Sequence, residues 1–578
     1  MWITGAELFV KALREEGVKT LFAYPGGSAI DLFDALYGVK DIDVVLPRHE
    51  QALVHAADGY ARATGEVGVC LVTSGPGATN LVTGIATANY DSVPLVCFTG
   101  QVPTSLIGND AFQEVDTVGI VRNICKYAVT VRKREDLGRI IHNAFYIAKS
   151  GKPGVVVVDI PKDIQLALGS DEIPKDIHIR GYNPNTSVHI GQVNKALEVL
   201  ERAKRPVFLL GGGINVARAN AKMTELAEKM GMPVVTTIMG KGAIPTNHDL
   251  YIGNLGIHGS YAANTAISKC DVLFSIGTRF NDRITGKIEK FASHATIIHV
   301  DIDPASISRN ISVNIPIVGD ANNAIEALLK RAKHLDIDEW RQEVTAWRDD
   351  FPIQMKKDED VLTPEYIIKA INRNYKNAII TTDVGQNQLW TTQYIEIDEN
   401  KRLLTSGGLG TMGYGLPSAI GAKIGCPHKE VVSINGDGGI QMNIQELATA
   451  VSQELPITIC IFNNGYLGNV RQWQEMFYNK RYSLTCLKYT KSCKRDCANC
   501  TNKQTTYTPD FVKLAQSYGA KGIRVFKKEE VVEAFKEAKK NKTTPTIIEF
   551  IIPDNLNVLP MVKPGNTLDD MVMEKGVK

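Results

Sequence analysis

The sequence predicts an α/β protein with three doubly wound parallel-sheet domains. Short apolar runs, of the length of buried strands, alternate along the chain with longer segments of helical periodicity. This alternation is typical of parallel sheets covered by helices on both faces. Glycine-rich or polar turns follow several of the runs, and such sheets bind their ligands at these strand ends. A chain of 578 residues has room for about three or four domains.

The first predicted domain spans residues 1–165. Its expected strands are residues 18–22, 44–46, 67–72, 95–98 and 155–160, and a helix is expected at 77–90. The turn after the first strand contains Tyr24, Pro25, Gly26 and Gly27. Loops at strand ends often carry binding residues, so this turn is a candidate ligand loop.

The middle predicted domain spans residues 187–333 and follows a polar connection. Its expected strands are residues 206–210, 233–237, 272–276, 297–301 and 315–318. Gly211, Gly212 and Gly213 directly follow the first of them. These glycines could approach a dinucleotide phosphate, although their spacing is not the G-x-G-x-x-G fingerprint.

The third predicted domain spans residues 361–555, and a tail of residues 556–578 follows it. Its expected strands include residues 378–383, 431–434 and 456–462. Asp437 lies in the glycine turn after the second of these strands, and Asn464 and Tyr466 follow the third. Because the carboxyl ends of parallel strands share one edge of a sheet, these polar groups are expected to lie close together.

This pattern suits a magnesium ion that holds a diphosphate. Magnesium prefers a carboxylate with neutral oxygens and leaves positions for phosphate oxygens, while Gly436, Gly438 and Gly439 would let the backbone approach the phosphates. The arrangement resembles the thiamine diphosphate motif, in which GDG is followed by NN. The resemblance makes Asp437, Asn464 and the Tyr466 carbonyl the metal ligands. Two unrelated turns at strand ends are the alternative.

Glu50 is the acidic residue of interest in the first domain, where it starts a helix just past a strand. On its own it would be a glutamate that the helix dipole favours. Thiamine diphosphate is activated when a buried carboxyl group shares a proton with its aminopyrimidine ring. Glu50 is therefore the candidate for that role.

Longer motifs identify a family. They are residues 49–51 (HEQ), 58–65 (DGYARATG), 73–80 (TSGPGATN), 110–114 (DAFQE), 412–417 (MGYGLP), 471–474 (RQWQ) and 557–562 (NVLPMV). Together they resemble the catalytic subunit of the acetohydroxyacid synthase family, also called acetolactate synthase, along nearly the whole chain. The fold would then be that of thiamine diphosphate-dependent enzymes.

The resemblance implies a reaction in branched-chain amino acid biosynthesis. Pyruvate would be decarboxylated and its hydroxyethyl unit joined to a second 2-keto acid, pyruvate or 2-ketobutyrate. Gln113, Phe112 and Lys126 would line the substrate pocket, and Trp473 would select the acceptor. A pyruvate oxidase or 2-keto-acid decarboxylase of the same superfamily is an alternative, as is a flavin-bound paralogue without catalytic activity.

The resemblance also assigns cofactor contacts. Gly385, Gln386 and Asn387 would form a second diphosphate loop, with Asn387 where the family usually has histidine; asparagine can still donate a hydrogen bond. Met412 would support the bent cofactor. In the middle domain FAD would be bound structurally by a further set of residues: Gly211, Gly212, Gly213, Arg279, Asp301 and Asp320. A plain interdomain scaffold is the alternative there. Asn469 replaces a usually apolar residue near the acceptor.

Cys486, Cys493, Cys497 and Cys500 form a cluster among lysines and an arginine. Their spacing is not the paired C-x-x-C signature of zinc sites. A metal or iron–sulfur cluster, redox-responsive disulfides and a solvated loop without metal all remain open.

Composition points to no general affinity for nucleic acid or membranes. The formal net charge is +2, and no apolar run is long enough to span a bilayer. A cytoplasmic protein is expected. By resemblance Glu50 of one subunit faces Asp437 of another, so a homodimer or homotetramer is expected, together with a small regulatory subunit.

Overall fold

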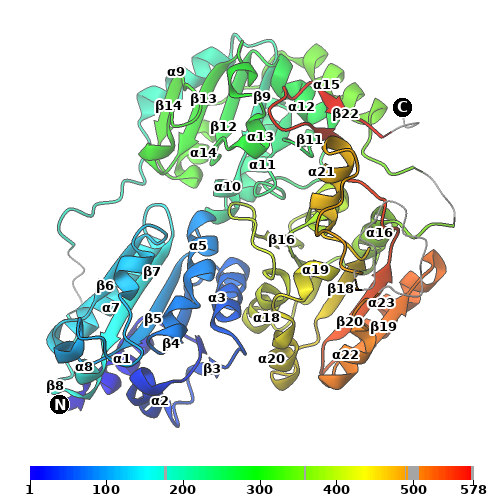
Figure 1. Ribbon diagram of the computed structural model, residues 1–578. Coiled ribbons are helices and arrows are strands. Elements are labelled where there is room, and N and C mark those ends of the chain that lie inside the picture. Colours follow the sequence, from blue (N-terminus) through cyan, green and yellow to red (C-terminus); the bar gives the residue numbers. More distant parts are fainter. Residues whose placement is uncertain (175–178, 357–359, 489, 492–506, 575–578) are drawn as a thin grey trace.

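The computed structural model describes residues 1–174, 179–356, 360–488, 490–491 and 507–574. Three six-stranded sheets, each entirely parallel, carry helices on both faces and form three lobes (Figure 1). This confirms the predicted fold class. Two antiparallel pairs complete the strand inventory of the described residues: β1 (Trp2–Thr4) with β8 (Leu168–Ser170), and β21 (Met561–Val562) with β22 (Met571–Val572).

The first sheet has the strand order β3-β2-β4-β5-β7-β6. Its strands are β2 (Thr20–Ala23), β3 (Asp43–Val45), β4 (Gly68–Val72), β5 (Leu95–Gln101), β6 (Tyr127–Thr130) and β7 (Val155–Pro161). Its helices are α1 (Gly5–Glu15), α2 (Ile30–Leu36), α3 (Glu50–Thr64), α4 (Pro76–Thr79), α5 (Val82–Tyr90), α6 (Thr117–Val121), α7 (Leu137–Lys149) and α8 (Lys162–Leu166). A capping box between Thr4 and Glu7 starts α1.

The middle sheet has the order β11-β10-β9-β12-β13-β14. Its strands are β9 (Pro206–Leu210), β10 (Val234–Thr236), β11 (Tyr251–Asn254), β12 (Val272–Ile276), β13 (Thr296–Asp301) and β14 (Ile315–Val318). Its helices are α9 (Ile190–Leu200), α10 (Gly212–Val216), α11 (Asn220–Met230), α12 (Tyr261–Lys269), α13 (Asp282–Thr285), α14 (Ala321–Leu329) and α15 (Asp338–Asp350).

The third sheet has the order β16-β15-β17-β18-β20-β19. Its strands are β15 (Ala378–Thr382), β16 (Arg402–Thr405), β17 (Glu430–Gly436), β18 (Thr458–Asn463), β19 (Lys521–Val525) and β20 (Thr546–Ile551). Its helices are α16 (Pro364–Asn374), α17 (Gln386–Tyr394), α18 (Gly415–Gly425), α19 (Asp437–Ile440), α20 (Leu447–Ser452), α21 (Gly468–Phe477), α22 (Phe511–Ser517) and α23 (Lys528–Lys540).

Five strands of the three six-stranded sheets were not among those expected from the sequence. Four of them, β6, β11, β16 and β19, lie at sheet edges. Edge strands are covered on fewer sides and need no continuous apolar run, so the pattern that identifies buried strands is weak there. The fifth, β20, is buried but is interrupted by Glu549, whose carboxylate accepts from Asn463 at 2.7 Å and Arg524 at 2.7 Å.

Helices α3 and α18 pack against each other where the first domain meets the third (Figure 1). Glycine permits the close approach: a Cβ at Gly421 would lie 1.7 Å from the carbonyl oxygen of Ala56, and a Cβ at Gly59 would lie 2.1 Å from that of Ser418. The helix that begins at Glu50 is therefore fixed directly against the third domain.

The tail crosses from the third domain to the middle one. Val562 N donates to Ile257 O at 2.7 Å, and Leu568 is buried in the middle-domain core. Within the described ranges, no helix is both long and apolar enough to cross a membrane.

Candidate active site

Asp437 and Asn464 lie at neighbouring strand ends, as the sequence predicted. Strands β17 and β18 are paired, with Gly436 opposite Phe462. Asp437 Oδ2 accepts from Gly465 N at 2.9 Å, and Asn464 Oδ1 accepts from Tyr466 N at 3.0 Å. Both side chains line one pocket, and Tyr466 lines it with them.

The oxygen atoms that line this pocket are suitable ligands for magnesium. Burial raises the pKa of Asp437 to about 7, and a bound divalent cation would offset the cost of keeping that carboxylate charged. The described residues contain no group of three or more His, Cys, Asp and Glu side chains arranged for a metal. One carboxylate with amide and carbonyl oxygens is instead the kind of site that magnesium shares with phosphate oxygens.

Glycines keep the pocket open for a diphosphate. A Cβ at Gly438 would lie 2.8 Å from the Leu467 side chain, and a Cβ at Gly439 would lie 2.3 Å from Asp383 Oδ1. Gly385, which has φ +145°, and Gly436 line the pocket beside them. Larger residues would fill this space, so the loops fit a ligand that approaches the backbone closely.

Asn387 departs from what was expected of it. Its Nδ2 donates to the carbonyls of Asp383 at 2.8 Å and Ile434 at 3.1 Å, so both amide hydrogens are used within the protein. Its Oδ1 lies against Gly385 and Gly436 instead. The side chain therefore offers an acceptor to the pocket and not the expected hydrogen-bond donor.

A buried carboxylate that the sequence reasoning missed, Asp383, holds the Met412 loop to this pocket. It accepts from Gly413 N at 3.0 Å, Gly415 N at 3.1 Å and Val384 N at 2.8 Å, and burial raises its pKa to about 6. Met412 lines the pocket. Asp383 directly follows strand β15, and this strand-end position was the signal available in the sequence.

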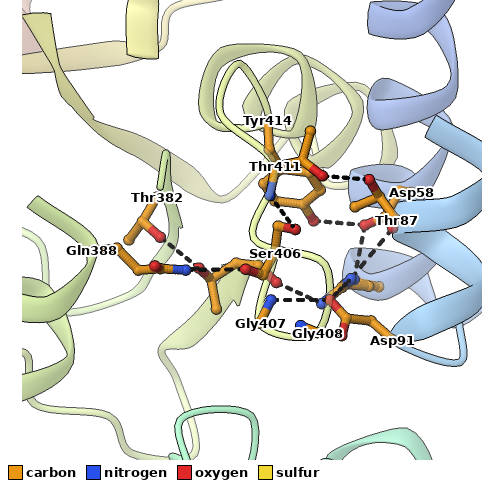
Figure 2. A network of polar contacts seen from close by, with 12 residues as sticks. Asp58, Thr87, Asp91, Thr382, Gln388, Ser406, Gly407, Gly408, Thr411 and Tyr414 are labelled. Atoms are coloured by element: carbon orange, nitrogen blue, oxygen red, sulfur yellow. Dashed lines mark hydrogen bonds and ion pairs between the residues drawn. The ribbon is translucent and has the colours of Figure 1, made fainter. Parts of the chain in front are cut away.

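A second network holds the other side of the same loop to the first domain (Figure 2). Asp91 accepts from Gly407 N at 3.1 Å and Gly408 N at 2.8 Å, and Thr87 is bonded to Thr411 at 2.7 Å. Tyr414 donates to Asp58 Oδ1 at 2.6 Å. The position of Met412 is thus set from both domains.

Glu50 and its neighbours form a separate group at the carboxyl edge of the first sheet. Asn80 Nδ2 donates to Glu50 Oε2 at 2.9 Å. A Cβ at Gly26 would lie 2.5 Å from Thr73, and Gln113, at φ 60°, lies against Gly75. The loop of Tyr24, Pro25, Gly26 and Gly27 thus packs on the loop that leads to Asn80.

Phe112, beside Gln113, is 88% exposed. Among the contacts of the described residues, none joins Glu50 to Asp437. The first-domain group around Glu50 and the pocket of Asp437 are therefore two separate groups among the described residues of one chain.

Family models for thiamine pyrophosphate enzymes match residues 3–120 (N-terminal TPP binding domain), 193–328 (central domain) and 383–550 (C-terminal TPP binding domain). A probable acetolactate synthase large subunit of Methanococcus aeolicus is 45% identical over 99% of this chain and 95% of its own length. The isozyme 3 large subunit of Escherichia coli acetolactate synthase is 44% identical over 99% of each chain. An acetolactate synthase of Mycobacterium bovis is 42% identical over 100% of this chain and 92% of its own.

The chain belongs to the acetolactate synthase large-subunit family. This confirms the family that the motifs indicated. The Glu50 group and the Asp437 pocket lie in the two domains matched as TPP binding.

In this acetolactate synthase family member, a large cavity of about 1550 Å³ adjoins the Asp437 pocket. Val384, Gly385 and Asn469 line both spaces. Of the residues expected to hold FAD, the following line the cavity: Gly212, Gly213, Arg279, Asp301 and Asp320. Gly211 lies behind them, since a Cβ there would be 2.1 Å from Gly277 O.

The cavity wall carries buried polar atoms without a partner among the described residues. They are Asn254 Nδ2, His258 Nδ1, Thr278 Oγ1, Asn281 Oδ1, Asn469 Oδ1 and Trp473 Nε1. Unpaired buried polar atoms are costly, so a wall of this kind fits a polar ligand. Burial also raises the pKa of Asp301 to about 6, while Asp303 N donates to its Oδ1 at 2.8 Å. The residues present therefore fit a large group such as FAD.

Trp473 lies on α21 and lines the large cavity, with Arg283 Cζ 5.8 Å from the centroid of its ring. Two further residues of the cavity wall, Lys241 and His258, were not expected. Burial lowers the pKa of Lys241 to about 7 and that of His258 to about 4. Each lies in a glycine-bracketed turn, Gly240–Gly242 and Gly256–Gly259, which was the available signal.

The structure does not place Lys126 with the other residues expected to line the substrate pocket. Its Nζ donates to the carbonyls of Ile147 and, at 2.6 Å, Ser150, at the end of α7, and lies over the Tyr182 ring. It lines neither of the two spaces described above. Lys162 reaches the first-domain loops instead and donates to Gly27 O at 3.0 Å. Its place directly after strand β7 could have singled it out.

Of the cysteine cluster, Cys486 is described. Its side chain is partly buried and forms no disulfide with another described cysteine, and its backbone pairs with that of Tyr466 in an isolated antiparallel β-bridge. Cys493, Cys497 and Cys500 lie outside the described residues.

Proposed function

We propose that this chain is a catalytic acetolactate synthase subunit, which decarboxylates pyruvate and joins the two-carbon unit to pyruvate or 2-ketobutyrate. The products would be acetolactate and acetohydroxybutyrate, for branched-chain amino acid synthesis. The observation that carries the proposal is the pocket of Asp437 and Asn464, which offers hard oxygen ligands beside a glycine-lined space. Relatives with the acetolactate synthase name, 42% to 45% identical along the whole chain, give the reaction class.

The third domain would hold the cofactor's diphosphate. Asp437, Asn464 and the Tyr466 carbonyl would bind magnesium, and the backbone of Gly436, Gly438 and Gly439 would face the phosphates. Gly385 and Gln386 would complete the loop opposite. When bound, thiamine diphosphate supplies an acidic thiazolium carbon that adds to the 2-keto group and accepts the electrons released by decarboxylation. Met412, held between Asp383 and the first domain, would support the cofactor from below.

The first domain would supply the proton chemistry. Glu50 would hold a proton against the pyrimidine ring, and Asn80, at 2.9 Å from its Oε2, would orient the carboxyl group. The loop of Tyr24, Pro25, Gly26 and Gly27 would pack beside that ring. Glu50 of one subunit would face Asp437 of a second, in a homodimer or a homotetramer; this agrees with the lack of any contact between Glu50 and Asp437 among the described residues of one chain.

Substrate selection would fall to residues at the mouth of the site. Gln113 lies against Gly75, in the loop that leads to Asn80, and its neighbour in the sequence, Phe112, is exposed. Trp473 lines the large cavity that adjoins the Asp437 pocket. Trp473 would pack against the alkyl group of the acceptor, and each methylene is worth about 1–3 kcal/mol in such a pocket. Asn469, with its unpaired Oδ1, adds a polar group there.

The middle domain would bind FAD without using its redox chemistry, because joining two 2-keto acids with loss of carbon dioxide transfers no net electrons. The name "large subunit" on the relatives supports a small regulatory partner for this chain. We place the enzyme in the cytoplasm.

Product analysis of the purified chain tests this proposal. The protein is incubated with thiamine diphosphate, magnesium, FAD and pyruvate, with and without 2-ketobutyrate. Acetolactate from the wild type, largely lost in Glu50→Gln, is the expected result. Glu529→Gln, at the exposed start of α23, is the matched control and should retain activity. Acetaldehyde or acetyl phosphate as the main product would reject carboligation in favour of a decarboxylase or an oxidase.

A further inference from the structure

The tail is joined to the metal pocket by a chain of three buried side-chain amides. Val558 N donates to Gln472 Oε1 at 2.8 Å, and Gln472 Nε2 donates to Val558 O at 3.0 Å. Gln386 Nε2 donates to Gln472 Oε1 at 3.0 Å and to Leu556 O at 3.0 Å. Asn464 Nδ2 then donates to Gln386 Oε1 at 3.2 Å.

Main-chain groups fix the direction of every bond in this chain. A backbone N–H can only donate, so Val558 requires the oxygen of Gln472 on its side. Gln386 then faces two acceptors, Gln472 Oε1 and Leu556 O, and must present its nitrogen to them. Its oxygen is left to accept a hydrogen bond from Asn464, so Asn464 must donate through its Nδ2. Asn464 Oδ1 is thereby turned away from Gln386, to the side where Tyr466 N donates to it.

These three side-chain amides, called the amide relay, have no room to flip. Gln472 is fully buried, Gln386 is 4% exposed and Asn464 is 8% exposed. A Cβ at Gly468 would lie 2.1 Å from Gln386 Oε1 and 2.9 Å from Asn464 Nδ2. A flipped amide would place two acceptors or two donors together where water cannot replace the lost bonds.

We propose that Gln386 and Gln472 are positioning residues, which use the backbone of the tail at Leu556 and Val558 to aim the Asn464 amide oxygen at the metal. The inference rests on the proposed function, because it takes Asn464 as a magnesium ligand. It makes tail docking part of the metal site: the metal stabilises the docked tail, and the docked tail raises the affinity for the metal by the same factor.

Manganese binding provides the first test, since Mn²⁺ can replace Mg²⁺ and its free ion gives an electron paramagnetic resonance signal. The full-length protein, saturated with thiamine diphosphate, is titrated with Mn²⁺. Gln386→Met keeps the length of the side chain but removes its hydrogen bonds. We expect its affinity for Mn²⁺ to fall about 10- to 100-fold, as is usual when the partner of a metal ligand is lost.

Gln393→Met is the matched control. Gln393 lies on the same helix, α17, and also donates to the tail, at Leu559 O, 3.2 Å away, but no described contact joins it to Asn464. Its affinity for Mn²⁺ should stay close to that of the wild type. Equal affinities in Gln386→Met and Gln393→Met would overturn the inference, whereas failure of the wild type to bind Mn²⁺ would overturn the proposed function along with it.

Hydrogen exchange gives a second readout, and its main comparison, made in the wild type, does not depend on a variant folding. Exchange of the Val558 amide is followed with thiamine diphosphate alone and with thiamine diphosphate plus Mn²⁺. The inference predicts slower exchange at Val558 when the metal is added, and loss of that difference in Gln386→Met. A Val558 amide that exchanges at the same rate with and without Mn²⁺ would contradict the coupling.

Discussion

Asp91 gives the sharpest test of how the first domain holds the Met412 loop. Its fully buried carboxylate accepts from Gly407 N at 3.1 Å, from Gly408 N at 2.8 Å and from Arg62 Nη2 at 3.1 Å. In Asp91→Asn the negative charge is lost, and an amide NH₂ must face groups that all donate. The substitution leaves the volume of the side chain unchanged, so its effect reports on these polar contacts.

The expected loss of stability is about 3 kcal/mol. Breaking a buried ion pair costs about 3–5 kcal/mol, and the lower end applies because Asp58 still faces Arg62 Nε at 2.8 Å. The loss should appear first as faster hydrogen exchange at residues 406–414, since Asp91 bonds to that loop directly. Activity should fall as well, because Met412 lies within the loop.

Hydrogen exchange and thermal unfolding of the full chain measure both effects. Asp41→Asn is the control: Asp41 pairs with Arg14 at 2.7 Å, but both side chains are about half exposed, at 53% and 48%. Exposed pairs contribute little, so this variant should resemble the wild type. If Asp91→Asn matched Asp41→Asn in both measurements, the network would not be what holds the loop.

Three further predictions follow from buried groups. Burial lowers the pKa of His55 to about 3, below the unfolded value of about 6.5. His55 should therefore lower the free energy of unfolding of the wild type by about 2 kcal/mol between pH 7 and pH 5. His55→Phe should remove that part of the loss, as measured by urea titrations at the two pH values. In Gly421→Ala the new Cβ would lie 1.7 Å from Ala56 O, so soluble yield and melting temperature should drop sharply; a melting temperature like that of the wild type would show that α3 and α18 can separate at no cost. Asp437→Asn should abolish tight Mg²⁺ binding in calorimetry with thiamine diphosphate while leaving the apo protein folded; unchanged binding would place the metal elsewhere.

The sequence was sufficient for the fold class and for placing Asp437 and Asn464 in one pocket, for a physical reason. Continuous apolar runs identify buried parallel strands, and the ends of neighbouring parallel strands must meet, so Asp437 and Asn464 could be brought together before any coordinates were known. The edge strands β6, β16 and β19 could not be found in this way, because partial exposure weakens the apolar pattern. The edge strand β11 is mostly buried, but its four residues (YIGN) contain no continuous apolar run.

The direction in which individual side chains point could not be predicted from the sequence. Asn387 was expected to donate to a ligand, but the carbonyls of Asp383 and Ile434 use both of its hydrogens. Lys126 was expected in the substrate pocket, but the end of α7 holds it. The amide relay was equally hidden, because it depends on residues 386, 472 and 558 meeting in space.

The central claim is that Glu50 and Asp437 form one site across two subunits, and subunit mixing tests it most directly. Glu50→Gln and Asp437→Asn are each expected to be inactive. Mixed in equal amounts and allowed to exchange subunits, they should form hybrid dimers in which one of two sites has both native residues, giving about a quarter of the wild-type activity by random pairing. Acetolactate formation at that level would support the shared site. A mixture as inactive as either variant alone, with exchange verified by differently tagged chains, would contradict it.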